Sequence, residues 1–224
     1  MQNNYSRALG VLALDIEQNL MRGSLIHKDT HDYPILIERV PGAFVKNVVA
    51  GDETVISNYI KTGEKLIKQG VSALTTTCGF TIRFQKQLSS ALNVPIAASS
   101  LLLAPYLAAT YKDTIGIITY DSRSLKPSDL RYAGIEEGDW SRFPIIGLEN
   151  TQTWSAMALP ENNFEFEIMK ADLSNAVVRL LDKYPNVKCI LFECHGFPPA
   201  AEHIRKTFKL PVYDAVSNAK LLMT

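Results

Sequence analysis

Apolar positions follow the same order twice along this chain of 224 residues. In each copy, over residues 56–80 and 173–197, an amphipathic helical period leads through a short loop to an apolar run that ends in a cysteine. A second helical period and a turn containing proline then lead to another short apolar run. Strands that alternate with helices are typical of parallel sheets. The pattern therefore predicts two α/β units.

The spacing of individual residues supports this internal repeat. Cys78 and Pro95 are separated by as many positions as Cys194 and Pro211. The first strand of each half is also repeated, because the runs GVLALD and GIITYD both start with glycine, continue with apolar residues and end with aspartate. Such continuous apolar runs are typical of strands that are covered on both faces.

We therefore expect an α/β fold of two pseudo-symmetric lobes, each a mostly parallel sheet flanked by helices. The lobes would span residues 1–107 and 108–210. Residues 211–224 predict a strand and a helix that pack back on the first lobe. The turn-rich segment 22–53 is expected to cover the cleft between the lobes and to shape its specificity.

Composition and charge exclude several classes of protein. Lys plus Arg and Asp plus Glu both total 23, so no excess of positive charge is available for a nucleic acid. The uncharged stretch 91–110 has about the length of a membrane span, but its prolines and its central Ser99 and Ser100 favour a strand, a loop and a helix. Neither a nucleic acid nor a membrane is an expected partner.

The cysteines and the start of the chain indicate the cellular compartment. Three cysteines are too few, and odd in number, for a secreted disulfide framework. The first residues lack the basic stretch, apolar run and cleavage site of a signal peptide, so we expect a mature cytoplasmic protein. Dinucleotide-binding and triphosphate-binding glycine motifs and zinc-ligand spacings are missing from the sequence, and we expect no metal or organic cofactor.

Cys78 and Cys194 are the candidate catalytic residues. Both lie just after a predicted strand at its carboxyl end, where open parallel sheets bind ligands. The dipole of the next helix is expected to lower the thiol pKa towards neutrality. If a pseudo-twofold axis relates the halves, the thiols face each other across a cleft. One thiolate could then remove the proton α to a carboxylate while the other thiol protonates the opposite face.

Several other residues are candidates for substrate binding. The backbone amides at Gly79, Phe80, His195 and Gly196 could hold a carboxylate or an oxyanion. Ser99, Ser100 and Thr119 could donate to a carboxylate, although helix capping explains at least one of the serines equally well.

The remaining polar residues of the predicted strand ends allow more than one role. Asp15 could meet a substrate ammonium group or orient a thiol, or could be a loop acid. His195 could assist proton transfer, and Asp214 could support the site or the lobe interface. Alternation along the strand should point Glu193 away from the thiol, and Cys189 is expected in the core.

These residues give the chain a resemblance to the aspartate/glutamate/hydantoin racemase superfamily over almost its whole length. The segments that carry it are LGVLALD, DYPILIERVPGA, GVSALTTTCGF, NVPIAASSLLLAP, IGIITYDSRSL and FECHGFPPAAEHIRKTFKLPVYD. The resemblance implies an active site between the two lobes, cofactor-independent proton exchange by Cys78 and Cys194, and a homo-oligomer. Many amino-acid racemases of the superfamily have Asn-Thr after the first cysteine and Thr-His after the second, whereas this chain has CGF and CHGF.

The departures from that pattern leave the substrate open. The expected activity is a racemase or epimerase of amino-acid metabolism that acts on aspartate, glutamate or another amino acid, or on a hydantoin, with a small carboxylate or hydantoin-like molecule as its ligand. An enzyme similar to arylmalonate decarboxylase or maleate isomerase is the alternative on the same fold. A non-enzymatic alternative is a small-acid binding protein in which the two cysteines form a redox pair.

Overall fold

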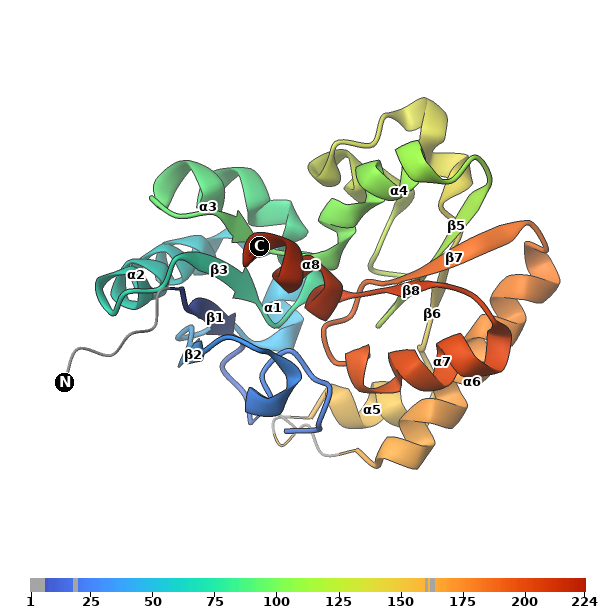
Figure 1. The fold of residues 1–224 in the computed structure, drawn as a ribbon, viewed down its shortest axis with the longest axis horizontal. Coiled ribbons are helices and arrows are strands. Elements are labelled where there is room, and N and C mark those ends of the chain that lie inside the picture. Colours follow the sequence, from blue (N-terminus) through green and yellow to red (C-terminus); the bar gives the residue numbers. More distant parts are fainter. Residues whose placement is uncertain (1–6, 18–19, 160, 162–163) are drawn as a thin grey trace.

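The computed structural model describes residues 7–17, 20–159, 161 and 164–224, and these form two four-stranded parallel sheets (Figure 1). The first sheet has the order β2-β1-β3-β4 and the second the order β6-β5-β7-β8. The two orders are the same when each sheet is numbered from its own first strand. The prediction of two α/β lobes with parallel sheets is therefore confirmed.

The strands are short and the central ones are buried. Those of the first sheet are β1 (Leu9–Ala13), β2 (Ile35–Arg39), β3 (Ala73–Thr76) and β4 (Ile96–Ala97). Those of the second are β5 (Thr114–Thr119), β6 (Ile145–Gly147), β7 (Val187–Phe192) and β8 (Val212–Tyr213). Every residue of β1 and β3 is buried, as the continuous apolar runs predict. In contrast, β2 lies within the segment 22–53 that was expected to be a cover over the cleft.

Helices flank both sheets (Figure 1). Those in the first half are α1 (Val45–Ala50), α2 (Ile56–Lys68), α3 (Gln85–Ala91) and α4 (Ala104–Thr110). Those in the second half are α5 (Gln152–Met157), α6 (Phe166–Lys183), α7 (Ala201–Phe208) and α8 (Ala215–Leu222). Close packing of α6 on its sheet requires Gly116, because a Cβ there would lie 2.2 Å from the side chain of Leu180. Within the described residues no helix is long and apolar enough to cross a membrane.

The end of the chain connects the two lobes. Strand β8 pairs with β7 and so belongs to the second sheet, contrary to the expectation that all of residues 211–224 return to the first lobe. Helix α8 does return, and Ala215 and Ala219 pack with Leu9 and Ala73 of the first sheet. Asp214 caps this helix by accepting a hydrogen bond from the Ser217 amide at 2.8 Å. Asp214 thus stabilises the start of the helix that joins the two lobes.

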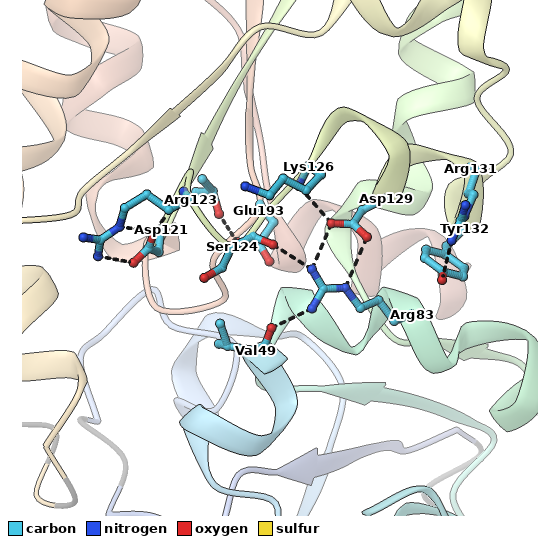
Figure 2. Close-up of polar contacts among 11 residues, drawn as sticks. Val49, Arg83, Asp121, Arg123, Ser124, Lys126, Asp129, Arg131, Tyr132 and Glu193 are labelled. Carbon is cyan, nitrogen blue, oxygen red and sulfur yellow. Dashed lines mark hydrogen bonds and ion pairs between the residues drawn. The ribbon is translucent and has the colours of Figure 1, made fainter. Parts of the chain in front are cut away.

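A partly buried arginine also joins the lobes (Figure 2). Arg83 lies in the 3-10 helix η3 (Gly79–Phe84), directly after Cys78. Its guanidinium donates to the carboxylate of Asp129 in the second lobe at 2.9 and 3.2 Å. It also donates to the carbonyl oxygens of Val49 at 2.6 Å and Ser124 at 2.7 Å. Four hydrogen bonds from one side chain therefore fix the segment after Cys78 against both lobes.

Replacing Arg83 with Met should lower the free energy of unfolding by about 3 kcal/mol, because it leaves Asp129 charged and unpaired in a largely buried position. Lys65→Met removes the exposed Lys65–Glu38 pair and should cost less than about 1 kcal/mol. Urea unfolding followed by circular dichroism measures both values. Equal losses for the two variants would contradict the importance given to Arg83.

Candidate active site

The two cysteines of the repeat line one pocket between the lobes. Cys78 lies after β3 and Cys194 after β7, the strands that occupy equivalent places in the two sheets. Both side chains are nearly buried, with relative exposures of 8% and 9%. The pocket encloses a cavity of about 70 Å³. The arrangement fits the expectation of two thiols that face a single small molecule.

The wall of this pocket is mainly apolar. Its aromatic and sulfur-containing side chains are Phe80, Tyr120, Phe164, Met21 and Met157, and its aliphatic ones include Leu14, Ile16, Leu25, Ile26, Val45 and Val49. Several of these residues come from segment 22–53, which does contribute to the cover of the cleft as expected. Among the described residues that line the pocket, none is a lysine or an arginine.

The environment of the thiols differs from the one that the sequence predicted. Desolvation by burial, together with the smaller effect of the nearby Glu193 carboxyl, raises the pKa of Cys78 to about 12 and that of Cys194 well above its ordinary value. The expected lowering of the thiol pKa towards neutrality is therefore wrong. Cys78 precedes a 3-10 helix of six residues, and Cys194 precedes a turn, so little helix dipole opposes the desolvation.

Backbone amides next to the cysteines point at the thiols. The amides of Phe80 and Thr81 lie near the sulfur of Cys78, and that of Gly196 lies near the sulfur of Cys194. These contacts lower the thiol pKa and oppose part of the desolvation. The expectation that the amides at Phe80 and Gly196 hold a substrate carboxylate stays a prediction. Gly79 and His195 also line the pocket.

Glu193 lies in the pocket wall, which corrects the prediction that it points away from the thiols. Its side chain is fully buried, and Oε2 accepts a hydrogen bond from the Thr119 hydroxyl at 2.8 Å. Oε1 has no hydrogen-bond partner among the described residues. Burial raises the pKa of this carboxyl to about 7. Glu193 therefore adds a third ionisable group close to both thiols.

His195 connects the lobes through both of its ring nitrogens. Nδ1 bonds to the carbonyl oxygen of Thr76 at 2.5 Å, and Nε2 accepts from the backbone amide of Ser100 at 3.3 Å. Burial lowers the pKa of the imidazole to about 4, so the ring is neutral near pH 7. With both nitrogens engaged by the backbone, the ring has no free site for the proton transfer that the sequence suggested.

Three hydroxyl groups predicted to bind substrate are used by the protein itself. Ser99 accepts from the Leu101 amide and caps the next helix. Ser100 donates to the carbonyl oxygen of Phe192 at 2.7 Å, and Thr119 donates to Glu193. All three side chains are completely buried and none lines the pocket. Ser100 and Thr119 thus support the segment that leads to Cys194, whereas Ser99 serves as a helix cap.

Asp15 also lies outside the pocket lining, between two residues that belong to it. Its Oδ2 accepts a hydrogen bond from the Gly42 amide at 2.9 Å, as expected for a loop acid. Cys189 is completely buried within β7 and lies in the core, as the sequence predicted.

The high thiol pKa values predict slow alkylation of the unliganded protein. At pH 7 iodoacetamide should alkylate Cys78 and Cys194 much more slowly than it alkylates the thiol of free glutathione. The alkylation rate of both cysteines should rise about tenfold per pH unit up to at least pH 10, because only the thiolate reacts. Mass spectrometry of peptides from timed samples measures each site. A rate that levels off near pH 7 would show that a thiolate already exists in the empty pocket.

Curated proteins of known activity resemble the chain over most of its length. The dimethylsulfoniopropionate lyase of Durusdinium sp. clade D is 29% identical over 219 residues, which cover 95% of this chain and 72% of that protein. Dimethylsulfoniopropionate lyase 7 of Emiliania huxleyi strain CCMP1516 is 28% identical and is matched over 94% of this chain. The chain spans 64% of that Emiliania protein. No model of a known protein family matches the sequence.

Solved structures with the same architecture come from several enzymes. Allantoin racemase from Klebsiella pneumoniae superposes with a TM-score of 0.68 at 14% identity, over 97% of this chain and 86% of that one. Unliganded arylmalonate decarboxylase superposes with a TM-score of 0.63 at 17% identity, over 97% and 92%. Glutamate racemase from Francisella tularensis in complex with D-glutamate gives 0.60 at 14% identity, over 97% and 79%. The chain thus has the two-lobe α/β fold of the aspartate/glutamate/hydantoin racemase superfamily.

Proposed function

We propose that the protein is a lyase that removes the proton α to the carboxylate of a small substrate and expels a leaving group from the β carbon. The proposed substrate is dimethylsulfoniopropionate or a close analogue. The observation that carries this proposal is that Cys78 and Cys194, from equivalent positions of two lobes, line one pocket. The similarity to dimethylsulfoniopropionate lyases over most of the chain supports elimination as the reaction.

The apolar wall favours a sulfonium compound over an amino acid. An α-ammonium group has three N–H donors, each of which needs an acceptor when it is buried. A dimethylsulfonium group has no such donor and presents methyl groups and a positive charge, which suit aromatic faces. Phe80, Tyr120 and Phe164 contribute aromatic rings to the pocket lining, and Met157 contributes a thioether. The wall therefore fits the methylated substrate better.

Cys78 is the proposed base. Its sulfur receives two backbone amides, from Phe80 and Thr81, and the positive charge of Arg83 also lowers its pKa, whereas Cys194 receives one amide. Cys78 is therefore the easier thiol to ionise. A substrate that brings a positive charge next to it would lower its pKa further.

The proposed elimination uses groups of this chain and of the substrate. The thiolate of Cys78 takes the α proton, and the electron pair of that C–H bond forms the double bond between the α and β carbons. The C–S bond breaks and its electron pair stays on sulfur, so dimethyl sulfide and acrylate leave. The proton on Cys78 passes to water. During the reaction the Cys194 thiol donates a hydrogen bond to the charge that grows on the substrate carboxylate.

A racemase is the second candidate, as expected from the sequence. The two thiols at equivalent positions of the lobes would suit removal of a proton on one face of a carbon and delivery on the other. This reaction conserves the substrate's atoms, whereas elimination produces a volatile sulfide. The two candidates therefore differ in their products.

Proton NMR in D2O tests both candidates with dimethylsulfoniopropionate, aspartate, glutamate and allantoin as substrates. Wild type should convert dimethylsulfoniopropionate to acrylate. The protons on the chiral carbons of aspartate, glutamate and allantoin should not exchange with deuterium. Cys78→Ala should reduce kcat by roughly 10²–10⁴-fold, since it removes the base. Cys194→Ala should reduce it by about 10²-fold, because it removes one hydrogen bond to the developing charge.

Cys189→Ala is the matched control, because it removes a buried thiol that lies outside the pocket lining. It should keep kcat within about twofold of wild type. Exchange with inversion at a chiral carbon that needs both thiols would support the racemase. Elimination that persists without Cys78 would refute the proposed base.

A further inference from the structure

Glu193 has a buried carboxyl group in the pocket lining, and only one of its two oxygen atoms accepts a hydrogen bond. It lies directly after the last residue of β7 and has no exposed surface. Thr119 donates to Oε2, whereas Oε1 has no hydrogen-bond partner among the described residues. A carboxylate that is taken out of water without a full set of partners is costly. The lack of a hydrogen-bond partner at Oε1 does not contribute to folding stability and therefore points to a role in function.

The backbone of Gly79 packs directly against Glu193. A Cβ at this position would lie 2.3 Å from Oε1 and 2.1 Å from the carbonyl oxygen of Glu193, so no side chain fits between them. Both Gly79 and Glu193 belong to the pocket lining. The charge of Glu193 is thus separated from Cys78 and from a bound molecule by little more than a glycine backbone. In a site without bulk water such a charge acts strongly on its neighbours.

No side chain of the described pocket lining neutralises this charge, because none of them is a lysine or an arginine. The nearby Arg83 directs its guanidinium at Asp129, Val49 and Ser124 (Figure 2). Arg83 lowers the pKa of Glu193 through space, but Oε1 receives no hydrogen bond from it. Either a proton or a positive group of the ligand must therefore compensate Glu193.

On the basis of the proposed function, we propose that Glu193 is a specificity-determining residue that selects substrates with a permanently positive sulfonium or quaternary ammonium group. Its carboxylate is the counter-charge for that group, and the rings of Phe80 and Tyr120 contact the methyl groups. Recognition of this kind needs no N–H donor on the substrate. An isosteric substrate with a neutral carbon at the same place would leave Glu193 uncompensated and bind weakly.

A dependence on pH results from the other groups that face Glu193. They are Cys78, Cys194, Tyr120 and His195, together with the ion pair of Arg83 and Asp129. Cys78 and Tyr120 have a pKa of about 12, burial raises the pKa of Cys194 well above its ordinary value, and that of His195 is about 4, so these groups stay neutral between pH 6 and pH 8. Burial raises the pKa of Glu193 to about 7. A cationic ligand should therefore bind more tightly as pH rises through this range.

Two ligands of the same shape test the proposal. Trimethyl-β-alanine carries a quaternary nitrogen where 4,4-dimethylpentanoate carries a neutral carbon, and both have the same carboxylate. Calorimetry at pH 8 should give wild type at least a tenfold preference for the cation. Glu193→Gln should reduce this preference to about twofold or less. Glu149→Gln should keep it, because Glu149 hydrogen-bonds Ser122 and does not line the pocket.

Wild type alone provides a second test that does not depend on the folding of a variant. Between pH 8 and pH 6 its affinity for trimethyl-β-alanine should fall roughly fivefold as Glu193 takes up a proton, while its affinity for 4,4-dimethylpentanoate should not fall. Equal affinities of wild type for the two ligands at pH 8, or an unchanged preference in a folded Glu193→Gln variant, would overturn the proposal. If the protein prefers the cationic ligand but does not convert dimethylsulfoniopropionate, the proposed role of Glu193 is supported and the lyase is refuted. If it converts dimethylsulfoniopropionate but does not prefer the cationic ligand, the lyase is supported and the role of Glu193 is refuted.

Discussion

The burial of three acidic groups in a pocket whose described lining has no lysine or arginine is the constraint on which the function depends. Cys78, Cys194 and Glu193 are all removed from water, and burial raises the pKa of each. In the absence of a ligand, the thiols are therefore held in their neutral form. A positive charge must arrive with the ligand before a thiolate is favoured. Reactivity and ligand selection thus depend on the same electrostatic property.

The rest of the structure keeps these groups in place. The two sheets have the same strand order, which brings the ends of β3 and β7 to one pocket. Contacts between the lobes then fix the loops after these strands: Arg83 binds Asp129, and His195 binds Thr76 and Ser100. The polar residues expected to meet substrate serve mainly this purpose. Hydrogen bonds from fixed groups hold reactive atoms more precisely than a mobile loop would.

The sequence predicted the lobes, the parallel sheets and the two cysteines, because apolar periodicity and equal spacing are local properties of the chain. It missed the position of Glu193 because the alternation rule applies within a strand, and β7 ends at Phe192. It also missed the raised thiol pKa, since desolvation depends on side chains such as Tyr120 and Phe164 that are distant in sequence. The sequence did not predict strand β2, because turn-forming residues surround it and two of its five positions are exposed.

The central claim is that Cys78 and Cys194 act on a single bound molecule, Cys78 at its α carbon and Cys194 at its carboxylate. A crystal structure with trimethyl-β-alanine tests it most directly, because an amine leaves less readily than a sulfide and the ligand should remain intact. We predict its α carbon next to the sulfur of Cys78, its carboxylate next to the sulfur of Cys194 and its quaternary nitrogen on the side of Glu193. A ligand that lies outside this pocket, or that contacts neither sulfur, would contradict the account.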